Sequence, residues 1–178
     1  MIKYDCDYFF NLLRIQSATA KIIADIRWSF VVEINPLSVL DYGCGCGFFK
    51  AFAPPQVVVN TFDIMPVPQS GIMRQGYSLV TFWDVLEHID WEHAPDKGIE
   101  EAIQMGNYVA ITVPILPLGK DFKKWKHNKK GEHLHRFKTM DAVEHFFKQR
   151  GFELVKISKA ECILRQDIVS FLFKKCKS

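Results

Sequence analysis

Three glycines alternate along the chain directly after an apolar run, and a carboxylate precedes them. Gly43, Gly45 and Gly47 lie in the stretch VLDYGCGCGFF, and Asp41 stands two residues before the first of them. Glycine leaves peptide N–H groups bare, and a turn between a strand and a helix presents those donors beside the positive end of the helix. The pattern therefore predicts a ligand that lies close against the backbone of this turn.

Phosphate is the first ligand to consider at such a turn, but the sequence disfavours it. The patterns G-x-x-x-x-G-K-[ST] and G-x-G-x-x-G are both absent, because Phe48 and Lys50 stand where a last glycine is required. Asp41 would repel a phosphate but accept hydrogen bonds from an ammonium group. Asp63, which ends the next apolar run, is placed to accept hydrogen bonds from both hydroxyls of a ribose. An amino acid joined to a nucleoside satisfies both acids.

Strands and helices alternate along most of the chain. Runs rich in β-branched and aromatic residues predict six strands, LSVLDYG, QVVVNTFD, YSLVTFWD, NYVAITVP, FELVKIS and DIVSFLFKK. Apolar residues at helical spacing predict one or two helices from Tyr8 to Val32 and others over Trp91–Met105 and from Thr139 to Gly151. The helix that opens at GFFKAF is stopped early by Pro54-Pro55. We therefore expect an α/β domain around a mainly parallel sheet, with its ligand beyond the carboxyl ends of the central strands.

Composition indicates one ordinary globular domain. The 178 residues are 48% hydrophobic and 24% charged, and their net charge is +3. Five cysteines without a C-x-x-C pair suggest reduced thiols and no zinc site. Neither a secretory signal nor an apolar run of membrane-spanning length is evident, so we expect a cytoplasmic protein.

From about Leu37 to the C-terminus, the sequence resembles the class I S-adenosylmethionine-dependent methyltransferases, specifically the type 11/23-like domains. LDYGCGCG is similar to the first motif of that family, TFDI to the acidic end of its second strand, and YSLVTFWDVLEHI to its fourth-strand motif. GEHLHRFKTMDAVEHFFKQRGFELV is similar to the closing portion, in which a loop with histidines precedes the last helix. The resemblance implies S-adenosyl-L-methionine as cofactor and methyl transfer by direct displacement to an acceptor that the sequence does not identify.

The family fold implies a seven-stranded Rossmann-like sheet whose last strand is antiparallel. Only 20 residues separate Asp63 from Asp84, where relatives have a helix and a third strand, so we expect that edge to be shortened. IMPVPQSGIMRQG, in this interval, should be mostly loop. Residues 1–178 are expected to form one domain, with a helical cover over 1–35 and the Rossmann-like core over 37–178.

The resemblance also implies a set of residues at the cofactor. We expect it to comprise Asp41, Gly43, Cys44, Gly45, Gly47, Asp63, Ile64, Asp84 and Val85. Two purely structural roles are also compatible with these residues. The glycines could serve only a tight turn with close packing, and Asp84 could cap the helix that follows it.

Three histidines are candidates for a general base, which an alcohol or ring nitrogen acceptor needs and a phenol or carboxylate does not. In order they are His88, His133 and His135, because the unperturbed pKa of histidine lies near neutral pH. His88 could instead be a hydrogen-bonded structural residue. His133 and His135 could orient their loop, and no spacing offers convincing further ligands for a metal ion.

Basic residues concentrate between Lys120 and Arg136, where seven Lys or Arg face two acids. KDFKKWKHNKK places Trp125 among lysines, a mixture that suits phosphates with a stacked base, although a solvated loop looks much the same. Phosphorylated sugars, nucleotides, lipid head groups or an acidic carrier protein would also fit. The rival to an enzyme is therefore a non-catalytic module that binds a cofactor or nucleic acid. A nicotinamide-dependent oxidoreductase lacks the required glycine spacing.

Overall fold

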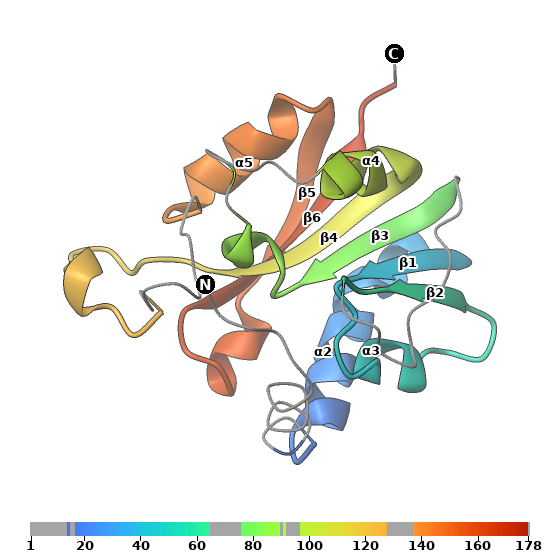
Figure 1. The fold of residues 1–178 in the computed structure, drawn as a ribbon, viewed down its shortest axis with the longest axis horizontal. Helices are drawn as coiled ribbons and strands as arrows, with labels where there is room; N and C mark the ends of the chain where they lie inside the picture. Colours follow the sequence, from blue (N-terminus) through green and yellow to red (C-terminus); the bar gives the residue numbers. More distant parts are fainter. Residues whose placement is uncertain are drawn as a thin grey trace.

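A single mixed sheet organises the part of the chain that the computed structural model describes, namely Arg14 and residues 17–64, 76–89, 91, 97–127 and 137–177. Its strand order is β2-β1-β3-β4-β6-β5 (Figure 1). The strands are β1 (Ser38–Tyr42), β2 (Val58–Phe62), β3 (Tyr77–Trp83), β4 (Gly106–Pro114), β5 (Phe152–Ser158) and β6 (Ile168–Lys175).

Strand direction confirms the predicted fold class. The pairs β1–β2, β1–β3 and β3–β4 are parallel, and β6 runs antiparallel to both β4 and β5. The described residues carry six strands where the family pattern implies seven. Within them β2 ends the sheet on the side where a shortened edge was expected, and the interval 65–75 lies outside the described residues.

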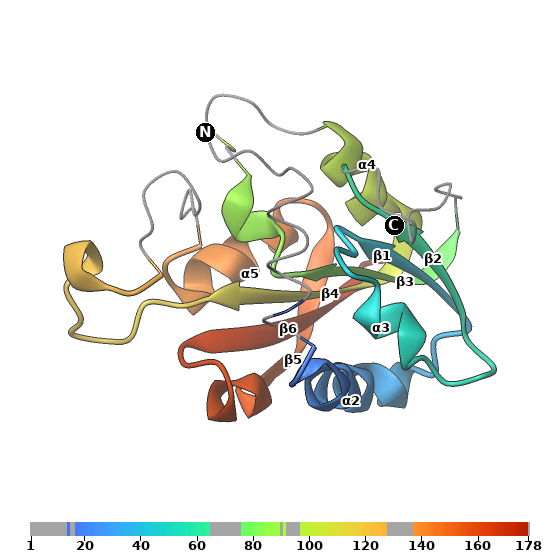
Figure 2. The same cartoon turned by 60° about the horizontal axis from the view of Figure 1, so that its bottom comes forward.

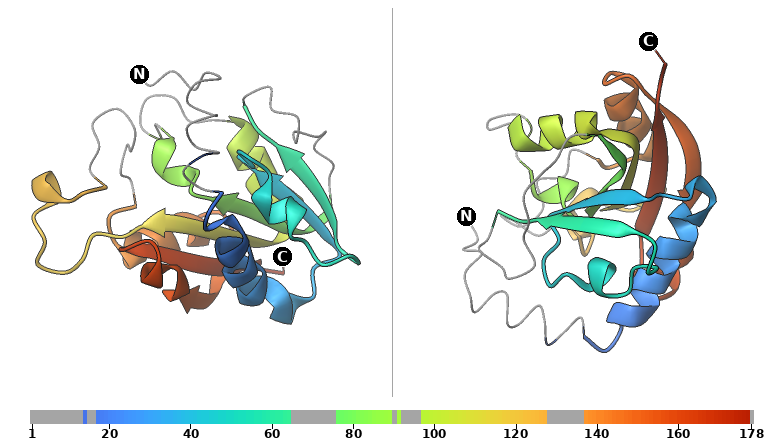
Figure 3. Two further views of the ribbon diagram at one scale, coloured as in Figure 1. Left: turned by 90° about the horizontal axis from the view of Figure 1, so that it is seen from below. Right: turned by 90° about the vertical axis from the view of Figure 1, so that its right-hand side faces the viewer.

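Helices cover both faces of the sheet. They are α2 (Ala20–Val31), α3 (Phe48–Ala51), α4 (Lys97–Met105) and α5 (Met140–Lys148), and α2 and α4 lie on opposite sides (Figures 2 and 3). Because side chains alternate along a strand, neighbours in sequence serve different cores. Leu40 and Val80 pack with α4 and α5, whereas Val39 and Leu79 pack with α2 and α3. None of the described helices is both long and apolar enough to span a bilayer.

The short helix α3 is fixed to the N-terminal helix α2. The indole Nε1 of Trp28 donates a hydrogen bond to the carbonyl oxygen of Phe49 at 2.9 Å, and the two rings stack with centroids 4.1 Å apart. Phe49 lies in α3, immediately after the glycine-rich turn. The N-terminal cover therefore supports that turn from one face of the sheet.

Most helix predictions are confirmed, with differences at the ends. Thr139 caps α5 by accepting a hydrogen bond from the backbone N–H of Ala142 at 3.2 Å. Helix α3 stops before Pro54, as expected. The helix expected over Trp91–Met105 begins only at Lys97 among the described residues, and Trp91 lies in a turn. Of the helices expected from Tyr8 to Val32, the structure describes α2, and residues 1–13 lie outside the described part.

Candidate functional site

The glycine-rich turn folds over the carboxyl end of β2. The backbone N–H groups of Gly43 and Cys44 both donate to the carbonyl oxygen of Phe62, at 2.7 and 3.1 Å. Gly43, Gly45 and Gly47 all have positive φ, of 73°, 49° and 72°. Such left-handed backbone costs a residue with a side chain free energy that glycine avoids, so the alternating glycines follow from the shape of the turn.

Two of these glycines serve different purposes. A Cβ on Gly43 would lie 2.4 Å from Cγ2 of Val85, so this glycine lets the turn pack against the end of β3. A Cβ on Gly45 would meet no atom of a described residue within 4 Å. Among those residues, close packing requires glycine at position 43 but not at position 45, where the positive φ of the turn is the local reason for glycine. The backbone of Gly45 is therefore open to a ligand on the side of its Cβ position as far as the described residues define it.

Two carboxylates flank the turn. Oδ2 of Asp63 accepts a hydrogen bond from the N–H of Gly45 at 2.9 Å, and Oδ1 of Asp41 accepts one from the hydroxyl of Thr81 at 2.8 Å. Asp41 is 2% exposed, and burial raises its pKa to about 6, with a further contribution from the negative charge of Asp63 and opposition from the Thr81 hydrogen bond. This end of the sheet is electronegative and suits a cationic group.

The cysteines of the turn are protonated thiols. Burial and the charges of Asp41 and Asp63 raise the pKa of Cys44 to about 12, and burial also raises the pKa of Cys46. Because a thiolate is the nucleophilic and metal-binding form, neither side chain is activated for covalent chemistry. Among the residues that the structure describes, no group of three or more His, Cys, Asp or Glu could hold a metal ion.

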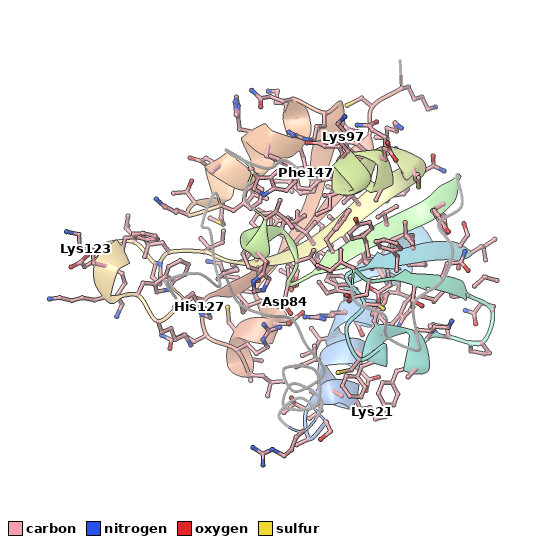
Figure 4. All side chains as sticks on the ribbon, in the orientation of Figure 1. Lys21, Asp84, Lys97, Lys123, His127 and Phe147 are labelled. Atoms are coloured by element: carbon pink, nitrogen blue, oxygen red, sulfur yellow. The ribbon has the colours of Figure 1, made fainter. Side chains whose placement is uncertain are left out.

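Asp84 is the centre of a part-buried ion cluster (Figure 4). Its Oδ2 accepts hydrogen bonds from Nη2 of Arg27 at 2.7 Å and Nη1 of Arg165 at 2.5 Å, and its Oδ1 accepts one from the hydroxyl of Thr112 at 3.1 Å. Burial raises the pKa of Asp84, but the charges of Arg165 and Arg27 outweigh burial and hold it below its ordinary value. Glu161 completes the cluster by accepting a hydrogen bond from Nε of Arg27 at 2.9 Å.

Asp84 does not act as a helix cap. It has a φ of 60°, and the one-turn helix η2 (Leu86–His88) that follows has no side-chain cap hydrogen bond. Sequence reasoning found Asp84 but missed both arginines and Glu161. They lie 57 to 134 residues from their partners, and only the folded sheet brings them together.

A third acid, Glu87, faces the same cluster. It is 4% exposed, and its Oε2 is buried without a hydrogen-bond partner. Burial and the negative charge of Asp84 raise its pKa well above the ordinary value, against the opposing charges of Arg165 and Arg27. Burial and the charge of Asp84 therefore favour the protonated form of Glu87, which lies beside two ion-paired arginines. The motif DVLEH contains it, but only its burial distinguishes it from a surface glutamate.

The remaining predicted site residues are distributed as follows. Ile64, after β2, is 71% exposed, and Val85 contacts the turn at Gly43. His88 is half-buried in η2, and its backbone N–H donates to the carbonyl oxygen of Val85 at 3.0 Å. His133 and His135 lie outside the described residues.

Trp125, considered above as a surface for stacking a base, is instead buried. It is 6% exposed, and its Nε1 donates a hydrogen bond to Oδ2 of Asp167 at 3.0 Å. The alternative of a base stacked on this ring does not fit, because the indole anchors its own segment to the connection before β6.

The raised pKa of Asp41 predicts a pH-dependent stability. A carboxyl whose pKa rises from 3.8 unfolded to about 6 folded favours the native state below about pH 4, and this advantage is lost as the pH rises to about 6. Relative to Asp41→Asn, the wild-type free energy of unfolding should fall by about 2 kcal/mol between pH 4 and pH 6. Urea unfolding of both proteins at several pH values measures this difference. Parallel pH profiles would contradict it.

The ion cluster predicts a large cost for neutralising Asp84. Asp84→Asn keeps a residue that tolerates positive φ but leaves Arg27 and Arg165 undercompensated, so we expect a loss of about 3 kcal/mol at pH 7. Asp25→Asn is the matched control, because it breaks the exposed Lys21–Asp25 pair and should cost about 0.5 kcal/mol or less. Urea denaturation compares them, and equal losses would show that the cluster is not a stabilising constraint.

Comparison with known proteins identifies a protein family and solved structures that share this fold. The family model described as a methyltransferase domain matches residues 15–157. No curated protein sequence matches the chain. Solved structures with the same fold include magnesium protoporphyrin IX methyltransferase (ChlM) from Synechocystis PCC 6803 with bound SAH, at 16% identity and a TM-score of 0.63 over 89% of this chain and 84% of that one.

Two further structures show how widely the fold is shared. TnmH is 14% identical with a TM-score of 0.69, and the match covers 94% of this chain but only 57% of TnmH. The 16S rRNA methylase ArmA is 14% identical with a TM-score of 0.56, over 94% of this chain and 90% of ArmA. At these identities the likeness shows the fold alone. Because the family model covers most of its length, the chain belongs to the methyltransferase domain family, as its resemblance to the class I S-adenosylmethionine-dependent enzymes indicated.

Proposed function

We propose that this chain transfers a methyl group from S-adenosylmethionine, bound at the carboxyl edge of β1 and β2, to a second substrate. One observation supports the position of the cofactor at this turn. No described residue fills the space beside the left-handed backbone of Gly45, and the carboxylates of Asp41 and Asp63 flank the same turn. S-adenosylmethionine carries an ammonium group, a cationic sulfur and a ribose, so both the charge and the bare backbone suit it.

We assign each group of the cofactor to a carboxylate according to the hydrogen bonds that the carboxylate already makes within the protein. Thr81 holds Oδ1 of Asp41, and no described residue donates a hydrogen bond to Oδ2, so we assign this atom to the ammonium group. Asp63 is assigned to the ribose hydroxyls, with Gly45 fixing its carboxylate. Backbone of the turn and of Ile64 would border the nucleoside. These assignments rest on the family resemblance together with the geometry.

Asp84 has a different part in this proposal. Because both of its oxygens are engaged by Arg27, Arg165 and Thr112, it serves as a positioning residue. It fixes the end of β3 and thereby the neighbouring Val85, which packs under Gly43. We therefore remove Asp84 from the set expected at the cofactor, which leaves Asp41, Gly43, Cys44, Gly45, Gly47, Asp63, Ile64 and Val85.

Methyl transfer by direct displacement requires no covalent intermediate with the protein. The bound cofactor supplies a methyl group on a cationic sulfur, and direct displacement by the acceptor leaves a neutral thioether. The protein contributes orientation and exclusion of water, which together lower the barrier by several kcal/mol in reactions of this kind. Where the acceptor must lose a proton, His88 is our first candidate for the base, followed by His133 and His135.

A turnover assay separates an enzyme from a binding module. Purified protein is incubated with methyl-labelled S-adenosylmethionine and a panel of phenols, carboxylates, alcohols and nucleic acids. Label transfer to any of them supports the enzyme. Tight binding of S-adenosylhomocysteine without transfer to any class would favour the non-catalytic module.

Gly45 provides the sharpest test of where the cofactor lies. Gly45→Ala should weaken binding of S-adenosylhomocysteine at least tenfold, because the new methyl group enters the space assigned to the ligand. Gly151→Ala is the matched control, since Gly151 also has positive φ and open space around its Cβ position but lies at the end of α5. Isothermal titration calorimetry measures both affinities. Equal affinities in two folded variants would reject the placement.

The titration of Asp41 predicts a pH-dependent affinity. The ammonium group binds the ionised carboxylate, and Asp41 has a pKa of about 6 in the free protein. Lowering the pH from about 6 to 4.5 should therefore weaken S-adenosylhomocysteine up to about tenfold per pH unit. Asp41→Asn should bind weakly with a flat profile. Asp63→Asn should lose affinity but keep the slope, and a wild-type affinity independent of pH would contradict the assignment.

A further inference from the structure

A projecting basic segment, Leu118–His127, leaves the sheet beyond β4 and is not part of the cofactor site proposed above. We call it the basic arm. Figure 1 shows it reaching beyond the end of β4, and Figure 4 places Lys123 at its outer end. The arm contains the one-turn helix η3 (Phe122–Lys124), which Asp121 caps by accepting a hydrogen bond from the N–H of Lys123 at 2.9 Å.

The basic arm is anchored rather than loose. Trp125 donates to Asp167, and Nε2 of His127 lies 2.9 Å from the carbonyl oxygen of Gln166. Before the arm, the N–H of Ile115 donates to the carbonyl oxygen of Asp167 at 2.9 Å. These contacts hold the arm against residues 166–167, next to Arg165 of the ion cluster. Its base therefore lies beside the carboxyl edge that carries the proposed active site.

Four of the seven exposed residues of the arm are lysines. Lys120, Lys123, Lys124 and Lys126 are all exposed, and Asp121 is the only acid in the ten-residue sequence. Four lysines against one aspartate give a net charge of +3, which equals the net charge of the entire chain. The remaining residues are therefore neutral in sum, and the positive field of the protein originates largely here.

The aromatic and apolar side chains near these lysines indicate which kind of partner the arm binds. Protein interfaces are depleted in lysine and depend on exposed aromatic anchors, but Trp125 is buried and the ring of Phe122 is half-buried, 4.3 Å from Nζ of Lys138. Leu118 is the one large apolar side chain that the described arm exposes fully, which is too little for stable insertion into a membrane. Closely spaced lysine charges without apolar anchors instead suit a chain of phosphates.

We propose that the basic arm binds the phosphate backbone of a nucleic acid and holds it at the carboxyl edge of the sheet. Binding itself is independent of methyl transfer. That the bound nucleic acid is also the methyl acceptor rests on the proposed function above. Lysines bind phosphates as point charges, so we expect little preference for sequence.

The experiment uses the full chain and a fluorescently labelled 20-nucleotide single-stranded RNA. Lys120, Lys123, Lys124 and Lys126 are changed together to glutamine. The control changes Lys97, Lys148, Lys159 and Lys174, which are exposed on other parts of the surface, so that both variants lose the same charge. Anisotropy gives the affinity at several salt concentrations, and calorimetry with S-adenosylhomocysteine checks the cofactor site in each protein.

We expect the arm variant to bind RNA at least tenfold more weakly in 50 mM salt. Its slope of log affinity against log salt should be shallower by about 3, as four lost phosphate contacts on a single strand predict. The control should stay within about twofold of wild type, and the affinity for S-adenosylhomocysteine should be the same in all three proteins. Because that measurement is separate, failure of the arm and failure of the cofactor site are distinguishable.

Several results would overturn the proposal. Equal losses in the two variants would mean that only net charge matters. Absence of RNA binding by the wild type would exclude the partner. Stronger arm-dependent binding to vesicles of phosphatidylserine would indicate a membrane, and equal competition by polyglutamate would indicate an acidic protein.

Discussion

One carboxylate connects three distant parts of this fold. Asp84, at the end of β3, is bonded to Arg27 from the N-terminal helix and to Arg165 from the connection before β6. A part-buried carboxylate between two guanidinium groups is costly to break, because each charge would otherwise lose water without gaining a partner. The cluster therefore fixes where the helical cover and the connection lie relative to the carboxyl edge. Residues 166 and 167, which follow Arg165, then anchor the basic arm.

The same cluster determines which carboxylates at this edge of the sheet are paired with arginines. Arg27 and Arg165 are paired with Asp84 and Glu161, and burial and the charge of Asp84 raise the pKa of the third acid, Glu87. The carboxylates of Asp84 and Glu161 are thus already matched by cations at the end of β3. The turn after β1 differs, because the carboxylates of Asp41 and Asp63 both flank it, and the negative charge of Asp63 contributes to the raised pKa of Asp41. A cationic ligand is consequently attracted to the turn rather than to the strand end beside it.

The sequence predicted the sheet well because local pattern determines its strands. Runs such as YSLVTFW are rich in apolar, β-branched and aromatic residues, which favours a buried strand, and Thr139 marked the start of α5 through its capping hydroxyl. The glycine-rich turn was also predictable, since positive φ at alternate positions restricts the residue type. The ion cluster was not predictable. No local pattern relates Arg27 to Glu161 across 134 residues, and Trp125 among lysines gave no sign that its ring would turn inward.

The two proposed binding surfaces carry opposite charges at one edge of the sheet, and they differ in how solvent affects them. Asp41 is buried, so its attraction for an ammonium group is weakly screened by salt. The lysines of the basic arm are exposed, and at physiological ionic strength charges more than about 8 Å apart on such a surface act almost independently. Ionic strength should therefore act on the arm and spare the turn, whereas pH near 6 should act on the turn and spare the lysines. If both proposals hold, this separation allows the chain to bind a cationic cofactor and an anionic partner side by side without either charge cancelling the other.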